Sequence, residues 1–163
     1  MIDCTYMNEF VAKKLVEVLA FCNVGLNTFN KGQMALGEVL EANRVNEIRN
    51  SLSTRAKLIE EMVKGSDSED VTLAKAKKTG AKLTSMRDMY IGEEWDNPTE
   101  LMEWSGFFEG AAIVHWEFVS GAAKGIGNEE LTQIAASALA EHKDTLNTAS
   151  HVLNGVGLAK SSI

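Results

Sequence analysis

Residues 97–125 read NPTELMEWSGFFEGAAIVHWEFVSGAAKG, and this stretch decides the fold class. Asn97 can cap a helix, Pro98 suits the first helical position, and Glu100 at the third position favours a helix start. Apolar side chains then recur at steps of three and four residues, which predicts one long amphipathic helix that ends at Lys124-Gly125. The stripe predicted to face the core comprises Leu101, Trp104, Phe108, Ala111, His115, Phe118 and Ala122.

A further helix is predicted after a connection of only a few residues. Asn128-Glu129-Glu130 provides a cap residue followed by two acids, a combination that favours a helix N-terminus. An apolar stripe then runs from Leu131 to Leu153 in the same rhythm. So short a connection predicts an antiparallel helical hairpin over residues 98–154.

The N-terminal part of the chain carries the signals of another hairpin. One amphipathic helix is predicted from about Thr5 to Phe29, and Asn30-Lys31-Gly32 supplies a turn with glycine at the helix exit. A second, uninterrupted helix is predicted from there to about Lys64. The first hairpin would therefore span residues 5–64.

A weaker helix over residues 69–91 is predicted to join the hairpins. Its apolar positions are sparse, and Gly80 lies in its middle at a cost of about 1 kcal/mol relative to alanine. The chain has a single proline, Pro98, and no run of alternating β-branched residues, so strands are not expected. The expected fold is an all-α antiparallel helix bundle of two long hairpins, forming one domain over residues 1–163.

The charge of the chain narrows the classes of partner. The formal net charge is −7, which disfavours phosphate backbones and anionic lipid as partners, so we expect neither nucleic-acid nor membrane-surface binding. No apolar stretch is long enough to span a bilayer. The sequence shows no secretory signal pattern, so a cytoplasmic location is the default expectation.

Three ionisable residues interrupt the apolar stripes: Glu41, His115 and His142. The hairpin geometry predicts that His142 lies level with Glu109, and that Glu41 lies level with Cys22. One interpretation is that the histidines sit at the edge of the core in a purely structural role. The other is that these side chains form a site, because buried ionisable groups are enriched at functional sites.

The segments Glu109–Glu117 and Glu141–Asp144 resemble the last two helices of ferritin-like four-helix bundles. Proteins of that class hold two metal ions between carboxylate and imidazole ligands in the bundle core. The resemblance implies iron or manganese as cofactor, with Glu41, Glu109, His115 and His142 as the ligands. The chain departs from the class because it contains no Glu-x-x-His motif.

The predicted helix 98–125 is apolar on more than one side. A helix of this kind must be covered on several sides, by its own chain or by a neighbouring subunit. We therefore expect Trp104, Phe107 and Trp116 to form an interface between copies, with further contacts made by the terminal helices.

The stretch Glu41–Ile59 and the run Leu131–Leu153 resemble the terminal coiled helices of type III secretion filament and needle-tip subunits. That resemblance implies self-assembly, and an extracellular location if it holds. Together with the absence of any complete catalytic motif in the sequence, it favours a non-enzymatic, homo-oligomeric structural protein. The alternatives are a ferritin-like metal-binding or redox bundle and a partner-binding adaptor bundle.

Overall fold

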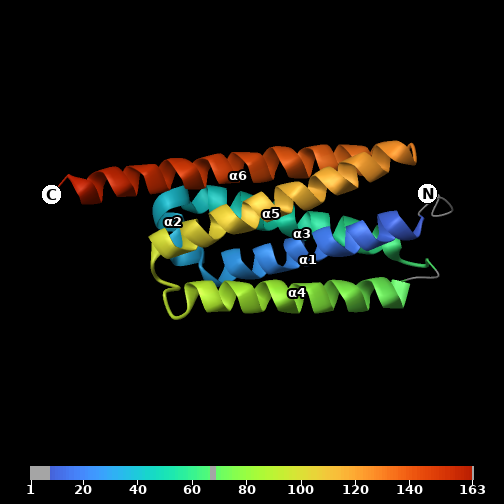
Figure 1. Cartoon of the computed structure of the whole chain (residues 1–163), viewed down its shortest axis with the longest axis horizontal. Helices are drawn as coiled ribbons and strands as arrows, with labels where there is room; N and C mark the ends of the chain where they lie inside the picture. The colour runs from blue at the N-terminus through green and yellow to red at the C-terminus, as the bar shows by residue number, and fades with distance from the viewer. Residues whose placement is uncertain (1–7, 67–68, 163) are drawn as a thin grey trace.

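The computed structural model describes residues 8–66 and 69–162, which form six α-helices and no β-strand (Figure 1). The all-α class predicted from the sequence is confirmed. The helices are α1 (Glu9–Lys31), α2 (Gln33–Leu40), α3 (Ala42–Val63), α4 (Glu69–Ile91), α5 (Pro98–Gly125) and α6 (Glu129–Ser161). None of the helices in this part of the chain is long and apolar enough to cross a membrane.

The first hairpin differs from its prediction at one point. The helix expected to run unbroken to about Lys64 is divided at Glu41, whose φ of 65° and ψ of 143° are not helical. A non-glycine residue held in such a region costs of the order of 1–3 kcal/mol. The break sets α2 apart from α3, so that α2 packs against both α3 and α5 while α3 continues along α1.

The helix predicted over residues 69–91 is α4, and it packs mainly on α1 of its own chain. Arg87 anchors it there. The guanidinium is buried, and its Nη1 donates hydrogen bonds to Asn27 Oδ1 at 2.7 Å and to Thr28 Oγ1 at 3.2 Å on α1. The guanidinium carbon also lies 5.0 Å from the centre of the Trp95 ring, so a cation–π contact adds to the hydrogen bonds.

The second hairpin forms as its start signals predict. The side chain of Asn97 accepts a hydrogen bond from the backbone N–H of Thr99 at the start of α5, and that of Asn128 accepts one from Leu131 at the start of α6. The two helices run antiparallel along most of their length (Figure 1). However, α6 does not end near Asn154-Gly155 but continues to Ser161, and its last turns project beyond the start of α5 with exposed side chains.

The buried stripe of α5 is partly different from the predicted one. In the second half of the helix, Ala111 and Phe118 are exposed and His115 is only partly buried, whereas Ala112, Trp116 and Val119 are buried. The two stripes have the same spacing and are displaced by one residue. The observed stripe turns the small residues Ala112 and Ala123 inward, which lets α5 and α6 approach closely.

Candidate functional site

Glu109 and His142 are the two predicted site residues that the structure brings together. Glu109 Oε2 and His142 Nδ1 are hydrogen-bonded across the α5–α6 hairpin. This agrees with the prediction that His142 lies level with Glu109. Both side chains are buried, and burial raises the pKa of Glu109 above its usual value of 4.5, although the hydrogen bond to His142 acts in the opposite direction. The Nε2 atom of His142 is also buried and has no hydrogen-bond partner among the described residues.

The other two predicted metal ligands lie elsewhere. His115 is partly buried, its Nδ1 lies 2.9 Å from Glu17 Oε2 of α1, and its ring centre is 5.0 Å from that of Phe21. Glu41 is exposed at the break between α2 and α3. Within residues 8–66 and 69–162, no group of three or more His, Cys, Asp or Glu side chains could hold a metal ion.

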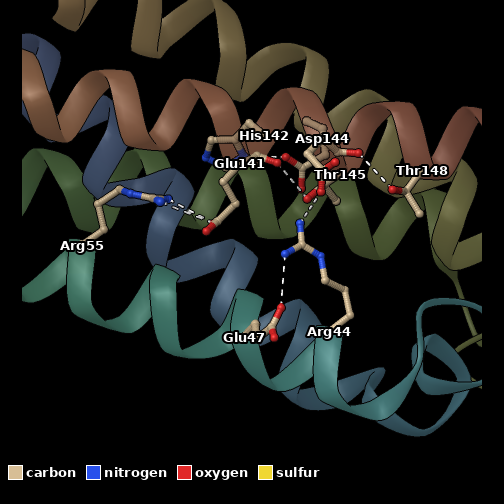
Figure 2. A network of polar contacts seen from close by, with 9 residues as sticks. Arg44, Glu47, Arg55, Glu141, His142, Asp144, Thr145 and Thr148 are labelled. Atoms are coloured by element: carbon tan, nitrogen blue, oxygen red, sulfur yellow. Dashed lines mark hydrogen bonds and ion pairs between the residues drawn. The ribbon is translucent and has the colours of Figure 1, made fainter.

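A buried arginine that the sequence reasoning missed lies next to the Glu109–His142 pair. Arg55 of α3 is 5% exposed, and its Nη2 donates to Ser51 Oγ at 3.0 Å. The same guanidinium points across to Glu141 of α6 at 3.4 Å (Figure 2). Its position could have identified it, because Arg55 lies three residues after Leu52 and four before Ile59, in one row with these apolar residues on a helix.

An aromatic ring and a cysteine thiol lie near Arg55 in the core. The guanidinium carbon lies 5.7 Å from the centre of the Trp116 ring, a cation–π arrangement. Burial raises the pKa of the nearby Cys22 thiol to about 12. Since the thiolate is the nucleophilic form, Cys22 stays unreactive at neutral pH, and this region reads as an internal brace between α3, α5 and α6.

The predicted interface residues divide between the inside and the outside of the molecule. Trp116 is completely buried within its own chain and Trp104 is 5% exposed, so neither of these predicted interface residues offers much surface to a second copy in this structure. Their rings point toward the core, where α5 packs mainly against α6 and α1 and, less extensively, against α2 and α4. Phe107, the third predicted residue, is 65% exposed.

A continuous apolar stripe does remain on the outer side of α5. We call this the α5 face and define it as Phe107, Ala111, Val114 and Phe118, all of which are exposed. Their spacing of four, three and four residues places them in one row along the helix. At one end of the row, Lys14 of α1 holds its ammonium 4.6 Å from the centre of the Phe118 ring.

An apolar groove adjoins the other end of the α5 face. It lies between α4 and α5, over Phe21 of α1, and has a volume of about 530 Å³. Tyr90 forms part of its wall, with ring centres 5.3 Å from Phe107 and 6.0 Å from Trp104, and the Tyr90 hydroxyl donates to Glu103 at 3.1 Å. The groove is lined by Phe21, Leu83, Met86, Met89, Tyr90, Trp104, Phe107, Phe108 and Ala111.

Comparison of the chain with protein-family models, with curated proteins and with solved structures finds no match.

Proposed function

We propose that the chain is a non-enzymatic structural protein that self-associates, and that copies meet through the α5 face and the groove beside it. The observation that carries this proposal is the amount of apolar surface gathered there. Seven large apolar side chains on this side of the molecule are between 38% and 79% exposed: Phe10, Met86, Met89, Tyr90, Phe107, Val114 and Phe118.

The size of this surface matches what a stable interface needs. If each side chain has about 200 Å² to bury, the exposed fractions correspond to roughly 800 Å². A standard protein–protein interface buries about 800 Å² on each partner, whereas the largest apolar patch on a typical monomer is about 300–600 Å². The surface is also continuous, since α5 links the groove at Phe107 to Lys14 and Phe10 beyond Phe118.

Residue types at the groove support a binding role. Methionine side chains are flexible and polarizable, and exposed aromatic rings are typical anchors of interfaces. A second copy of the chain offers the same apolar surface and is therefore a matching partner. Assembly of this kind agrees with the resemblance of the sequence to type III secretion filament and needle-tip subunits.

The experiment is a measurement of molar mass by light scattering over a range of protein concentrations. We expect the mass to exceed that of one chain and to rise with concentration. Phe107→Glu and Val114→Glu each place a charge on the α5 face and should shift the protein toward the monomer. Met34→Glu is the matched control, because Met34 is 82% exposed on α2 and belongs neither to the α5 face nor to the lining of the groove.

A wild-type chain that stays monomeric at the highest concentration would overturn the proposal and favour the partner-binding adaptor. An equal effect of the Met34 control would also contradict it, because the loss of assembly would then not depend on the α5 face. Elemental analysis of the same sample tests the ferritin-like alternative through its iron and manganese content. We do not propose a metal centre, because the four predicted ligands lie in three separate places.

A further inference from the structure

The residues of the α5 face have the same spacing in both directions along the helix. From Phe107 the next members follow after four, three and four residues, and from Phe118 the same steps lead back. A twofold axis near residues 112 and 113 would therefore place Phe107 of one copy opposite Phe118 of a second copy. The same axis would place Ala111 opposite Val114. Self-complementary faces of this kind form isologous dimers.

The α5 face has a lysine side chain at one end and a glutamate side chain at the other. At the Phe118 end, the Lys14 ammonium lies over the ring at 4.6 Å. At the Phe107 end, Glu103 lies one helical turn before Phe107 and accepts the hydrogen bond of Tyr90. An antiparallel pairing of two α5 helices brings Lys14 of each copy toward Glu103 of the other, whereas a parallel pairing would bring like charges together.

The backbone of α5 leaves room for a close neighbour. A Cβ atom added at Gly106 or Gly110 would meet nothing within 4 Å among the described residues. These glycines flank Phe107 and Ala111, so a second helix could come close to α5 there while the phenyl rings project to either side.

We propose that two copies pair antiparallel through their α5 faces, and that Phe118 of each copy enters the α4–α5 groove of the other. This inference rests on the proposed function and gives it a geometry. Phe107 and Ala111 line the groove, so a ring placed opposite Phe107 lies at its mouth. An apolar cavity of about 150 Å³ holds benzene, and the groove of about 530 Å³ has room for a phenyl ring.

The test is a charge exchange between copies, measured by sedimentation velocity as the dimer dissociation constant. Lys14→Glu and Glu103→Lys each place like charges opposite one another in both symmetric contacts, and each should weaken the dimer at least tenfold. An equimolar mixture of the two single variants restores two opposite-charge contacts in the heterodimer. We expect the mixture to recover to within about threefold of the wild-type constant.

This mixture separates pairing between copies from effects within one copy. Lys14 also contacts Glu17 of its own chain at 3.1 Å, and the loss of that contact persists in the mixture. Recovery therefore requires that residues 14 and 103 meet across the interface. Phe118→Ala provides a second measurement and should weaken the dimer at least tenfold, with Met34→Ala as the unaffected control.

Two results would overturn the pairing while leaving self-association in place. One is a mixture that associates no better than its weaker component, and the other is a Phe118→Ala variant that dimerises like the wild type. A wild-type chain that remains monomeric would instead overturn the proposed function itself, so the two failures are distinguishable. Far-UV circular dichroism of each variant checks that the helices are retained.

Discussion

The imidazole of His142 and the carboxyl of Glu109 form a hydrogen-bonded pair that joins α6 to α5 inside the core, and each side chain is only 3% exposed. Arg55 and Glu141 lie beside this pair. Because Glu109 and His142 are both buried, either side chain would lose its hydrogen-bond partner if the other were removed. The cost of removing one partner should therefore far exceed the cost of removing both.

We expect Glu109→Leu to lower the free energy of unfolding by about 3–5 kcal/mol, because it leaves His142 buried without its partner. His142→Leu should cost a similar amount. The double variant Glu109→Leu/His142→Leu should lie within about 1–2 kcal/mol of the wild type, since apolar residues can replace a buried pair. Urea denaturation of all four proteins gives the coupling, and additive losses would contradict it.

Stability should also depend on pH through Glu109. Its folded pKa is raised above 4.5, mainly by burial, so the folded chain keeps this proton at pH values where the unfolded chain has lost it. The contribution is complete below about pH 4.5 and is lost as pH rises through the folded pKa. The difference in unfolding free energy between wild type and Glu109→Gln should therefore fall with rising pH. A difference that grows with pH would show that His142 stabilises the carboxylate instead.

Trp116 and Phe107 should respond in opposite ways to truncation. Trp116→Ala empties a fully buried site and should lower the free energy of unfolding by about 3–5 kcal/mol. Phe107→Ala removes an exposed ring and should change the stability of the monomer by less than about 0.5 kcal/mol while it weakens association. Denaturation and light scattering on the same two variants check both effects. A stable Trp116→Ala protein would contradict the packing of α5.

Glu41→Gly should stabilise the chain by about 1 kcal/mol. The positive φ at this position is costly for glutamate and free of strain for glycine. Glu38→Gly is the matched control, because Glu38 is an exposed residue inside α2 and glycine there should cost about 1 kcal/mol. Thermal denaturation of the two variants compares them. Equal losses would mean that residues 33–63 form one continuous helix.

Arg55 and Arg44 allow a test of how burial changes the contribution of an ion pair to the free energy of unfolding. Both reach from α3 to a carboxylate on α6, Arg55 to Glu141 and Arg44 to Asp144 (Figure 2). We expect Arg55→Ala to cost about 2–3 kcal/mol, because Glu141 is only partly exposed and loses its partner. Arg44→Ala should cost less than about 1 kcal/mol, since both of its partners are solvent-accessible. Similar losses in urea denaturation would contradict this ranking.

The parts of the fold that the sequence predicts well are those with local chemical signals. Asn97 and Pro98 mark the start of α5, Asn128 marks the start of α6, and the short connection between these helices places His142 level with Glu109. The break at Glu41 has no such signal, because glutamate stands at the positive-φ position where glycine would be expected.

Which α5 residues form the exposed α5 face depends on which side of the helix faces the core. The rows through Ala111 and Phe118 and through Ala112 and Trp116 have the same spacing, so hydrophobic periodicity alone does not distinguish them. The choice is made by tertiary packing, since α5 buries the row that meets α6, α1, α2 and α4. The sequence therefore indicates that this helix has apolar residues on more than one side, but it does not indicate which of them are buried and which are exposed.

The attachment of α4 has a consequence for the dynamics of the molecule. This helix is held mainly by α1, through the Arg87 anchor and a modest apolar contact, while the α1–α3 and α5–α6 hairpins have packing of their own. It can therefore open as a separate cooperative unit, at a lower free energy than global unfolding. Such an opening would uncover Phe21 and widen the groove beside α5, so the helix that forms one wall of the groove also sets how often the groove changes shape.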